Sequence, residues 1–378
     1  MDTNSPNAYA RAGVDTDIEA EASNIMYQAS KRTWDNRKGL IGEVQIPFDD
    51  FSGVKLIDIS NLPSGSYLNL HGDGTGTKPT TSELVDLPET LGEDLIAMVA
   101  DDAVKQGAEP GVVFNHIDLT TLGTDRKHFP RMQRIAEGLV NGANKANVAV
   151  INGEIAQMGS RIFGYGEFPF NWSAACVWFV RKDRIITGSK VCVGDRIVLF
   201  KEHGFRCNGL SLVQRTFKEA YGAEWYKESF GDSTLGMQVL LPSKIYTRAV
   251  IAAHGGFATD GECEIHGIAH ITGGGIPEKL GRLLRASGLG AELTDLFEMP
   301  PAMRQCQVVG SISDRDMYSA VNGGQGMAVI TPENNVDQLI ACARRFDIEA
   351  KDGGHIVTTP GIRLTSKGIK APGTKLTF

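Results

Sequence analysis

A short segment, Tyr67–Lys78, joins a strand pattern to a turn whose residue types could bind a phosphorylated ligand. Its first residues alternate bulky apolar with polar side chains, which predicts a half-buried strand. The turn that follows, DGTGTK at positions 73–78, has two glycines, which let backbone N–H groups approach a phosphate. Asp73 could hold a divalent metal through oxygen, and Lys78 could neutralise phosphate charge. The alternative is a hairpin turn with a capping aspartate, and the spacing excludes a Walker A loop.

An apolar helix predicted from Pro88 to Gln106 carries three carboxylates. Asp94 and Asp101 lie two turns apart on one face, about 10 Å from each other, and Asp102 lies on the neighbouring row. Carboxylates in such a helix are costly unless they face solvent or a cation. An acidic face in solvent is one interpretation, and metal ligation gains weight beside a phosphate-type turn.

A short strand over 148–151 leads into Asn152-Gly153-Glu154. An acidic residue directly after a strand and a glycine could join the carboxylates described above, so Glu154 is a further candidate metal ligand. The alternative is a turn glutamate that faces solvent.

Two later loops could bind the anionic part of a ligand. The loop His203–Ser211 enters a helix near 212–221, and Arg206, Asn208 and the backbone at Gly209 could bind an anion at the helix N-terminus. The three glycines Gly273–Gly275 are costly to order, which favours close approach of a ligand over a simple tight turn. An ordinary capped loop is the alternative at 203–211.

Length, composition and net charge limit the class of protein. A length of 378 residues favours two domains, and 42% apolar and 22% charged residues are typical of a globular protein. The net charge of −7 argues against a nucleic-acid scaffold. No apolar run is long enough for a membrane span, and no secretory signal opens the chain. Six scattered cysteines without a CxxC pair fit free thiols in a reducing cytoplasm better than a zinc site or disulfides.

Hydrophobic periodicity predicts alternating helices and strands, with a domain boundary in the polar, glycine-rich stretch 182–194. Further helices are expected over 18–31, 131–145 and 242–253, further strands over 111–119, 173–180, 196–200 and 328–331, and one helix with strands after residue 335.

Eight ordered blocks resemble the aminoimidazole ribonucleotide synthetase (phosphoribosylformylglycinamidine cyclo-ligase) family, over roughly Tyr9 to Thr331. The blocks are AGVD at 12–15, GDGTGTK at 72–78, GEDLIAM at 92–98, QGAEP at 106–110, NGEIAQM at 152–158, NGLSLV at 208–213, AHITGGGIPE at 269–278 and the MY–N–G–GM frame at 317–327. One glycine motif is weak support, but eight blocks at compatible spacing are strong.

The resemblance implies an α/β (α+β) fold with an N-terminal ATP-binding and dimerisation domain, 1–185, and a C-terminal α/β sandwich domain, 186–378. Two N-terminal sheets would close a barrel across a homodimer. The implied reaction uses ATP and Mg²⁺ to phosphorylate the amide oxygen of formylglycinamidine ribonucleotide and then closes the imidazole ring. The implied location is the cytoplasm, and neither nucleic acid nor membrane is expected as a partner.

The residues and the resemblance together assign the site. The catalytic residues are expected to be Asp73, Lys78, Asp94 and Arg206. The metal ligands are expected to be Asp73, Asp94, Asp102 and Glu154. The residues expected to bind ATP or the substrate are Gly74, Gly76, Thr77, Lys78, Asp101, Asn208, Gly209, Gly273, Gly274 and Gly275.

Several positions depart from the family pattern. Arg206 stands where the family normally has histidine, Asn115 where it tends to have an acid, and Ile155 and Gln157 replace a hydroxyl and a carboxylate. The segment 40–55 is longer and poorer in glycine. Because arginine stays charged, Arg206 cannot act as a base and is predicted to bind a substrate anion. The alternatives are another ATP-using enzyme of the superfamily or a degenerate nucleotide-binding paralogue.

Overall fold

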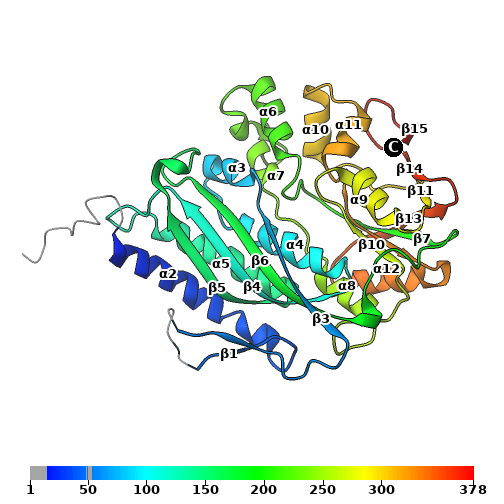
Figure 1. The fold of residues 1–378 in the computed structure, drawn as a ribbon. Helices are drawn as coiled ribbons and strands as arrows, with labels where there is room; N and C mark the ends of the chain where they lie inside the picture. The colour runs from blue at the N-terminus through cyan, green and yellow to red at the C-terminus, as the bar shows by residue number, and fades with distance from the viewer. Residues whose placement is uncertain (1–14, 48, 50–52) are drawn as a thin grey trace, which may run out of the picture.

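The computed structural model describes residues 15–47, 49 and 53–378, and these residues form two large sheets with their helices and two small two-stranded sheets (Figure 1). The N-terminal sheet has the order β3-β6-β4-β5, with β4 and β5 parallel and the other pairs antiparallel. Its strands are β3 (Ser66–Gly74), β4 (Glu109–Leu119), β5 (Ala149–Gln157) and β6 (Phe170–Arg181). Helices α2 (Thr16–Lys31), α4 (Thr90–Val104) and α5 (Phe129–Ala146) cover one face.

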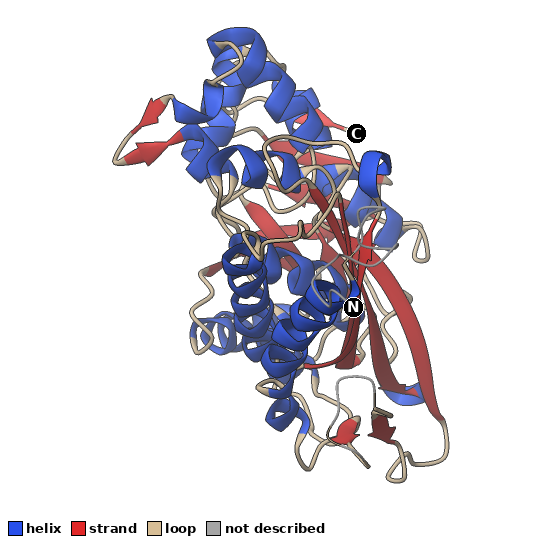
Figure 2. Ribbon diagram, turned by 90° about the vertical axis from the view of Figure 1, so that its left-hand side faces the viewer, coloured by secondary structure: helices blue, strands red, loops and turns tan. Residues whose placement is uncertain are grey.

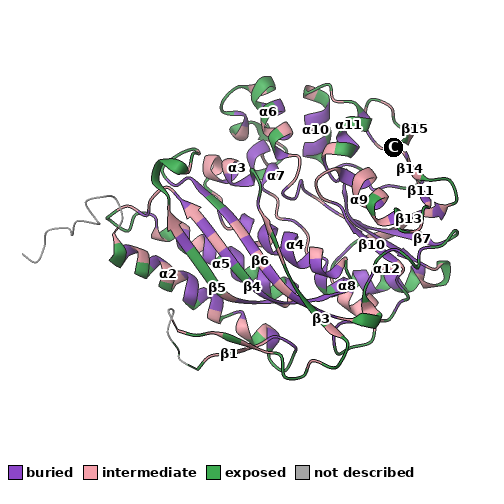
Figure 3. Ribbon diagram, viewed as in Figure 1, coloured by how far each residue is buried: buried purple, intermediate pink, exposed green. Residues whose placement is uncertain are grey.

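Within the described part of the chain, no helix covers the opposite face of this sheet, as Figure 2 shows. Leu68, Leu70 and Phe114 lie on it and are 50%, 61% and 40% exposed. Strand β3 is therefore mostly exposed, whereas α4 behind the sheet is almost wholly buried (Figure 3).

Glycines allow α4 to approach α5 closely. A Cβ atom on Gly92 would lie 2.0 Å from the backbone of Gly138, and a Cβ atom on Gly138 would lie 2.0 Å from the carbonyl oxygen of Glu89. This contact fixes α4 against the N-terminal sheet, and the other side of α4 faces α8 of the C-terminal domain.

The second sheet has the order β10-β12-β7-β13-β11-β14-β15. Its strands are β7 (Arg196–Lys201), β10 (Gly267–His270), β11 (Gly290–Leu293), β12 (Gln325–Thr331), β13 (Ala350–Val357), β14 (Gly361–Thr365) and β15 (Lys375–Thr377). Ile197 and Leu199 of β7 join one apolar core, and Val198 and Phe200 join another, because successive side chains point to opposite faces.

Helices cover both faces of the second sheet. The core with Ile197 includes residues of α6 (Leu210–Tyr221), α9 (Gly275–Leu284), α10 (Pro301–Val309) and α11 (Asp314–Ala320). The core with Val198 includes residues of α8 (Thr247–His254) and α12 (Val336–Arg344).

The remaining elements are short. They are α3 (Lys78–Val85), α7 (Leu235–Val239), β1 (Glu43–Gln45), β2 (Leu56–Asp58), β8 (Ser229–Phe230), β9 (Ser233–Thr234), η1 (Trp34–Arg37), η2 (Gly159–Arg161), η3 (Lys182–Arg184), η4 (Trp225–Lys227) and η5 (Glu333–Asn335). In the part of the chain that the structure describes, no helix has the length and apolar character needed to cross a membrane.

The predicted two-domain α/β fold is confirmed, and some predicted elements are wrong in extent. The helix expected from residue 242 begins at Thr247, because the backbone N–H groups of Ser243 and Tyr246 donate to Asp94 and Asp101 instead. The strand expected over 148–151 continues to residue 157. Helices α3 and α10 were not expected. Of the AGVD block, residues 12–14 lie outside the described residues, as do 48 and 50–52 of the segment 40–55.

Candidate active site

Strand β3 and helix α4 bring His71, Asp73 and Asp102 together. His71 and Asp73 are two residues apart on β3 and pair with the buried Cys176 and Ala174, so both side chains point toward α4. Asp102, near the end of α4, lies 2.9 Å from His71 Nε2 through its Oδ2. One ligand atom from each of these three residues lies within 4.8 Å of the others, so the structure brings two of the predicted metal ligands together.

The two carboxylates differ in their electrostatic surroundings. Burial raises the pKa of Asp73, and among the described residues no lysine or arginine forms an ion pair with it. Burial also opposes the charge on Asp102, but hydrogen bonds from His270 and His71 outweigh burial and hold the pKa of Asp102 well below its usual range. The pair therefore has a negative charge that a divalent cation would complement.

Carboxylate oxygens are ligands that Mg²⁺ prefers, so Asp73 and Asp102 fit a magnesium ion. His71 has a nitrogen ligand and fits better as the group that orients Asp102. Lys105 Nζ lies 2.7 Å from Asp102 Oδ1 and supplies part of the positive charge.

A buried chain of polar groups runs from Asp102 into the C-terminal domain. His270 Nδ1 lies 2.7 Å from Asp102 Oδ1, and His270 Nε2 lies 2.6 Å from Arg206 Nη2. Arginine can only donate, so His270 Nε2 accepts and its Nδ1–H donates to Asp102. Burial, reinforced by Arg206, lowers the pKa of His270 to about 4, which keeps the ring neutral.

Arg206 is fully buried and its guanidinium contacts carboxylates, whereas the sequence predicted a contact with a substrate anion. Its Nη1 donates to Glu202 at 2.8 Å and its Nη2 to Asp101 at 3.1 Å. Asp101 also accepts from Tyr246 N and Thr247 Oγ1, and burial raises its pKa to about 6 against the opposing effect of Arg206. These contacts give no support to a substrate anion on Arg206 or a ligand on Asp101.

Lys78 and Asp94 form a second buried pair. Lys78 Nζ lies 2.7 Å from Asp94 Oδ2, and both side chains are 0% exposed. Asp94 Oδ1 accepts from the backbone N and the Oγ of Ser243, and Lys78 donates to the carbonyl oxygen of Leu241. The structure therefore uses both residues to join α3, α4 and the segment before α8, and it does not place either beside Asp73.

The glycine-rich turn contacts the loop that leads into α6. A Cβ atom on Gly76 would lie 2.9 Å from the carbonyl oxygen of Cys207, and Thr77 Oγ1 lies 3.3 Å from Ser211 Oγ. Gly74 is the last residue of β3, at the start of this turn. The predicted phosphate-binding turn thus lies at the interface between the two domains.

The N-termini of α6 and α9 lie close together in the C-terminal domain. Gly209 and Gly274 are their N-caps, and both have positive φ. A Cβ atom on Gly273 would lie 3.5 Å from Asn208 Nδ2, and a Cβ atom on Gly275 would lie 1.8 Å from the carbonyl oxygen of Tyr318. Asn208 Oδ1 is buried and accepts no hydrogen bond from any residue that the structure describes. The structure thus brings Asn208, Gly209 and the three glycines together.

Glu154 lies apart from the other predicted metal ligands. Glu154 is exposed on β5. Across the sheet it is in register with His116 of β4, Ser173 of β6 and Gly74 of β3. Three strand spacings place it about 14 Å from β3, on the opposite face of the sheet from Asp73. The reason is that β5 continues through residues 152–157 and does not turn at Asn152.

Comparison with known proteins decides the family. The AIR synthase related protein family model matches residues 54–169 through its N-terminal domain and residues 193–367 through its C-terminal domain. The chain belongs to the AIR synthase related protein family. This result confirms the family recognised from the eight sequence blocks, and the boundary of the two domains near 182–194 stays a prediction.

Curated members of the AIR synthase related family match nearly the whole chain. The phosphoribosylformylglycinamidine cyclo-ligase of Thermococcus kodakarensis is 31% identical over 365 residues, which cover 96% of this chain and 99% of that protein. The cyclo-ligase of Methanococcoides burtonii is 33% identical over 334 residues, which cover 87% and 90%.

Solved structures share the fold at low sequence identity. HypE of E. coli, a hydrogenase maturation protein, has a TM-score of 0.61 at 16% identity and covers 94% of this chain and 95% of that chain. A HypE in complex with ATP has a TM-score of 0.56 at 16% identity and covers 85% and 87%. These structures establish the fold of this AIR synthase related protein and not its substrate.

Sequence reasoning missed His71 and His270. His71 could have been found from its spacing, because residues two apart on a strand share a face, and Asp73 had already been singled out. His270 stands in the AHITGGG block, in which only the glycines were predicted to contact a ligand. No local pattern predicts that His270 contacts Asp102, which is 168 residues away in the chain.

Proposed function

We propose that this protein catalyses the ATP-dependent ring closure of formylglycinamidine ribonucleotide to 5-aminoimidazole ribonucleotide, with release of ADP and phosphate. The observation that carries the proposal is the meeting of an acidic pair, a glycine-rich turn and two helix N-termini at one domain interface. Curated relatives with the cyclo-ligase name match nearly full length, which supports this substrate over that of a kinase.

ATP would bind where the acidic pair and the glycine-rich turn lie together. Asp73 and Asp102 would hold Mg²⁺, which neutralises phosphate charge when bound. Backbone N–H groups of the turn from Gly74 to Thr77 would donate to phosphate oxygens. His71 and His270 each contact Asp102 and would fix the direction of its carboxylate.

The phosphorylated end of the substrate would bind at the N-termini of α6 and α9, whose free N–H groups attract anions. Asn208 Oδ1 is a buried acceptor with no donor, which suits a ribose hydroxyl. In this arrangement the chain contributes positioning and charge compensation, which is most of what phosphoryl transfer requires.

We also propose that the protein is a homodimer. The open face of the N-terminal sheet exposes Leu68, Leu70 and Phe114, and a second sheet over this face would remove them from water. Glu154 lies on the same face and would then lie at the interface, close to the partner subunit. A cytoplasmic location would keep the free cysteines reduced.

The dimer is tested by Leu70→Lys, which places a charge on the exposed apolar face. We expect dimers for the parent protein in sedimentation and monomers for the variant. The control is Val308→Lys, because Val308 is an exposed apolar residue on α10 of the other domain. A parent protein that sediments as a monomer at micromolar concentration with ATP present would contradict the proposal.

The reaction is tested by measuring ADP release with and without formylglycinamidine ribonucleotide, together with detection of the aminoimidazole product. We expect ADP and aminoimidazole to form in equal amounts. Thiamine monophosphate serves as the control substrate, because a thiamine-monophosphate kinase shares the fold with a TM-score of 0.56. ADP release that depends on thiamine monophosphate and not on the ribonucleotide would refute the proposed function.

A further inference from the structure

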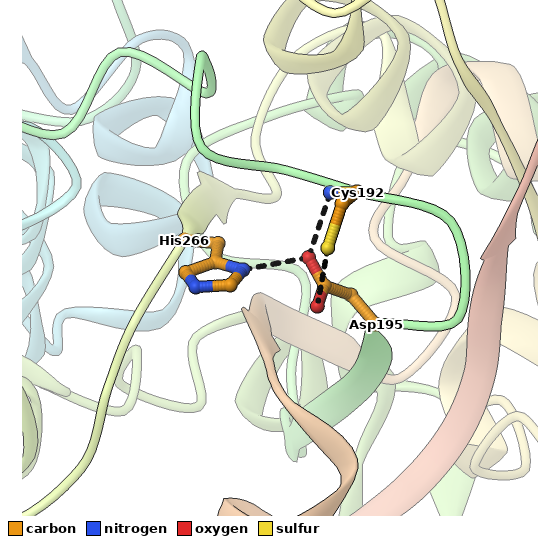
Figure 4. Close-up of side chains that lie close together, drawn as sticks. All are labelled: Cys192, Asp195 and His266. Atoms are coloured by element: carbon orange, nitrogen blue, oxygen red, sulfur yellow. Dashed lines mark hydrogen bonds and ion pairs between the residues drawn. The ribbon is translucent and has the colours of Figure 1, made fainter.

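A second group of metal-binding side chains lies in the C-terminal domain, outside the candidate active site. Cys192 and Asp195 belong to the turn before β7, and His266 directly precedes β10. Figure 4 shows the three side chains converging, with Asp195 between the other two. Neither the family comparison nor the proposed reaction uses these residues.

The distances within this group suit a small cation. Cys192 Sγ lies 3.3 Å from Asp195 Oδ1, and His266 Nδ1 lies 2.7 Å from Asp195 Oδ2. Around a tetrahedral Zn²⁺ with bonds of about 2.3 Å to sulfur and about 2.1 Å to oxygen, those two ligand atoms are about 3.6 Å apart. Cys192 Sγ and Asp195 Oδ1 are therefore already spaced nearly as ligands, and the imidazole, which contacts the other oxygen of the same carboxylate, would turn toward the ion.

Asp195 is a buried carboxylate without a lysine or arginine partner among the described residues. It is 3% exposed, and its contacts are the backbone N and thiol of Cys192 and the ring of His266. A buried charge is usually paired or coordinates a metal. Here the pairing could come from a protonated His266 or from a cation held by all three residues.

The surroundings of His266 favour coordination through Nδ1. Its other nitrogen, Nε2, lies 3.2 Å from Glu264 Oε1, so a proton on Nε2 would be accepted by that carboxylate. A metal-bound histidine commonly donates its second N–H to a carboxylate in this way. The backbone N of Cys192 donates to Asp195 Oδ2 at 2.9 Å, which fixes the orientation of the carboxylate.

A role for Cys192 as a nucleophile is not supported by the same contacts. The thiol donates to Asp195, and no imidazole or cation of the described residues forms a hydrogen bond with the sulfur. A reactive cysteine needs a group that stabilises the thiolate. A divalent metal would supply that group, which Asp195 alone does not.

We propose that Cys192, Asp195 and His266 bind one Zn²⁺ ion, with solvent as the fourth ligand. Binding releases the thiol proton of Cys192, while His266 coordinates as a neutral ring and Asp195 as a carboxylate. Cys192 is exposed, so ion and water can reach the site.

Such an ion would join the starts of two strands. β7 and β10 both pair with β12, and the ion would link the residue before β10 to the turn before β7. His270 stands four residues beyond His266, about 13 Å along β10. The ion would therefore hold the strand that delivers His270 to the candidate active site, without touching the reacting groups.

The test is a titration of metal-free protein with Co²⁺ and then with Zn²⁺. We expect a thiolate-to-Co²⁺ charge-transfer band that saturates at one ion per chain and disappears when Zn²⁺ displaces Co²⁺. Zn²⁺ should also slow the reaction of Cys192 with a thiol reagent and raise Tm. Among the described cysteines, the other five are buried, so this reagent reports on Cys192.

Variants separate the site from adventitious binding. Cys192→Ser should remove the band and the Tm increase, whereas the matched Cys263→Ser should keep the band. Glu264→Gln should weaken binding by about 10–100-fold without removing the band. Absence of the band in the parent protein, or its persistence in Cys192→Ser, would overturn the proposal and leave an aspartate–histidine pair.

Discussion

Lys78 and Asp94 form a buried pair whose role can be tested directly. The sequence predicted that both residues are catalytic, whereas their contacts indicate that they join the two domains. In Asp94→Asn the amide oxygen can still accept from Ser243, but the amide group presents a donor to Lys78, whose charge is then left without a counter-charge. Removing one partner of a buried ion pair costs about 3–5 kcal/mol. A chain of 378 residues that unfolds as one unit has an unfolding entropy of about 0.8 kcal/mol/K, so Tm should fall by about 4–6 °C.

The assay is thermal unfolding followed by circular dichroism, with the matched variant Asp73→Asn as control. Because burial already disfavours the charge on Asp73, its neutral isostere should not lower Tm, although it should abolish most activity. The double variant Lys78→Met/Asp94→Asn should lose clearly less stability than the sum of the single variants. An Asp94→Asn protein with the parent Tm and no activity would refute this reasoning and restore the catalytic role predicted from sequence.

Two further predictions concern the candidate active site, and a third concerns His254, the last residue of α8. Asp73→Asn should lower ATP turnover by at least about 100-fold and raise the Mg²⁺ concentration needed for half-maximal rate. Both are measured by ADP release over a magnesium titration, and an unchanged magnesium dependence would contradict the assignment of Asp73 as a metal ligand. Arg206→Ala should lower the free energy of unfolding by about 3–5 kcal/mol in denaturant titrations because Glu202 and Asp101 lose their counter-charge, and substrate KM would be the only parameter to change if Arg206 instead bound the substrate. Burial lowers the pKa of His254 in the folded state, so the unfolded state binds the proton first as pH falls. The stability of the protein should therefore be full above about pH 6.5 and decline below it. His254→Gln should reduce that decline in melting curves measured over a range of pH.

The sequence predicted the fold and part of the site because those features depend on local pattern. The alternation in Tyr67–His71 and the glycine-rich turn placed Asp73 at a strand end, and the α4 pattern placed Asp102 on the row next to Asp94 and Asp101. Both Asp73 and Asp102 meet in the structure. The seven-residue spacing of Asp94 and Asp101 correctly indicated one shared face.

The sequence could not show what that face contacts. Carboxylates on an apolar helix are the local pattern expected for metal ligands. The same pattern is expected for a helix that packs against Ser243, Tyr246 and Arg206, so sequence alone does not distinguish the two. The predicted position of Glu154 beside the other carboxylates was wrong for a different reason. The end of a strand depends on its pairing with a neighbour, and β4 continues to pair with β5 as far as Leu119 and Gln157.

Helix α4 also limits how the protein could be divided. If the chain were cut between its two family domains, Asp101 would lose Arg206, Tyr246 and Thr247, and Asp94 would lose Ser243. The freed N-terminal half would present Asp101 without a partner in an apolar surface and Asp94 with only Lys78, and the freed C-terminal half would present Arg206 without Asp101. Neither half is therefore an independent module for truncation, fusion or domain exchange, and a chimera with another member of the superfamily would have to carry both sides of this contact from the same parent.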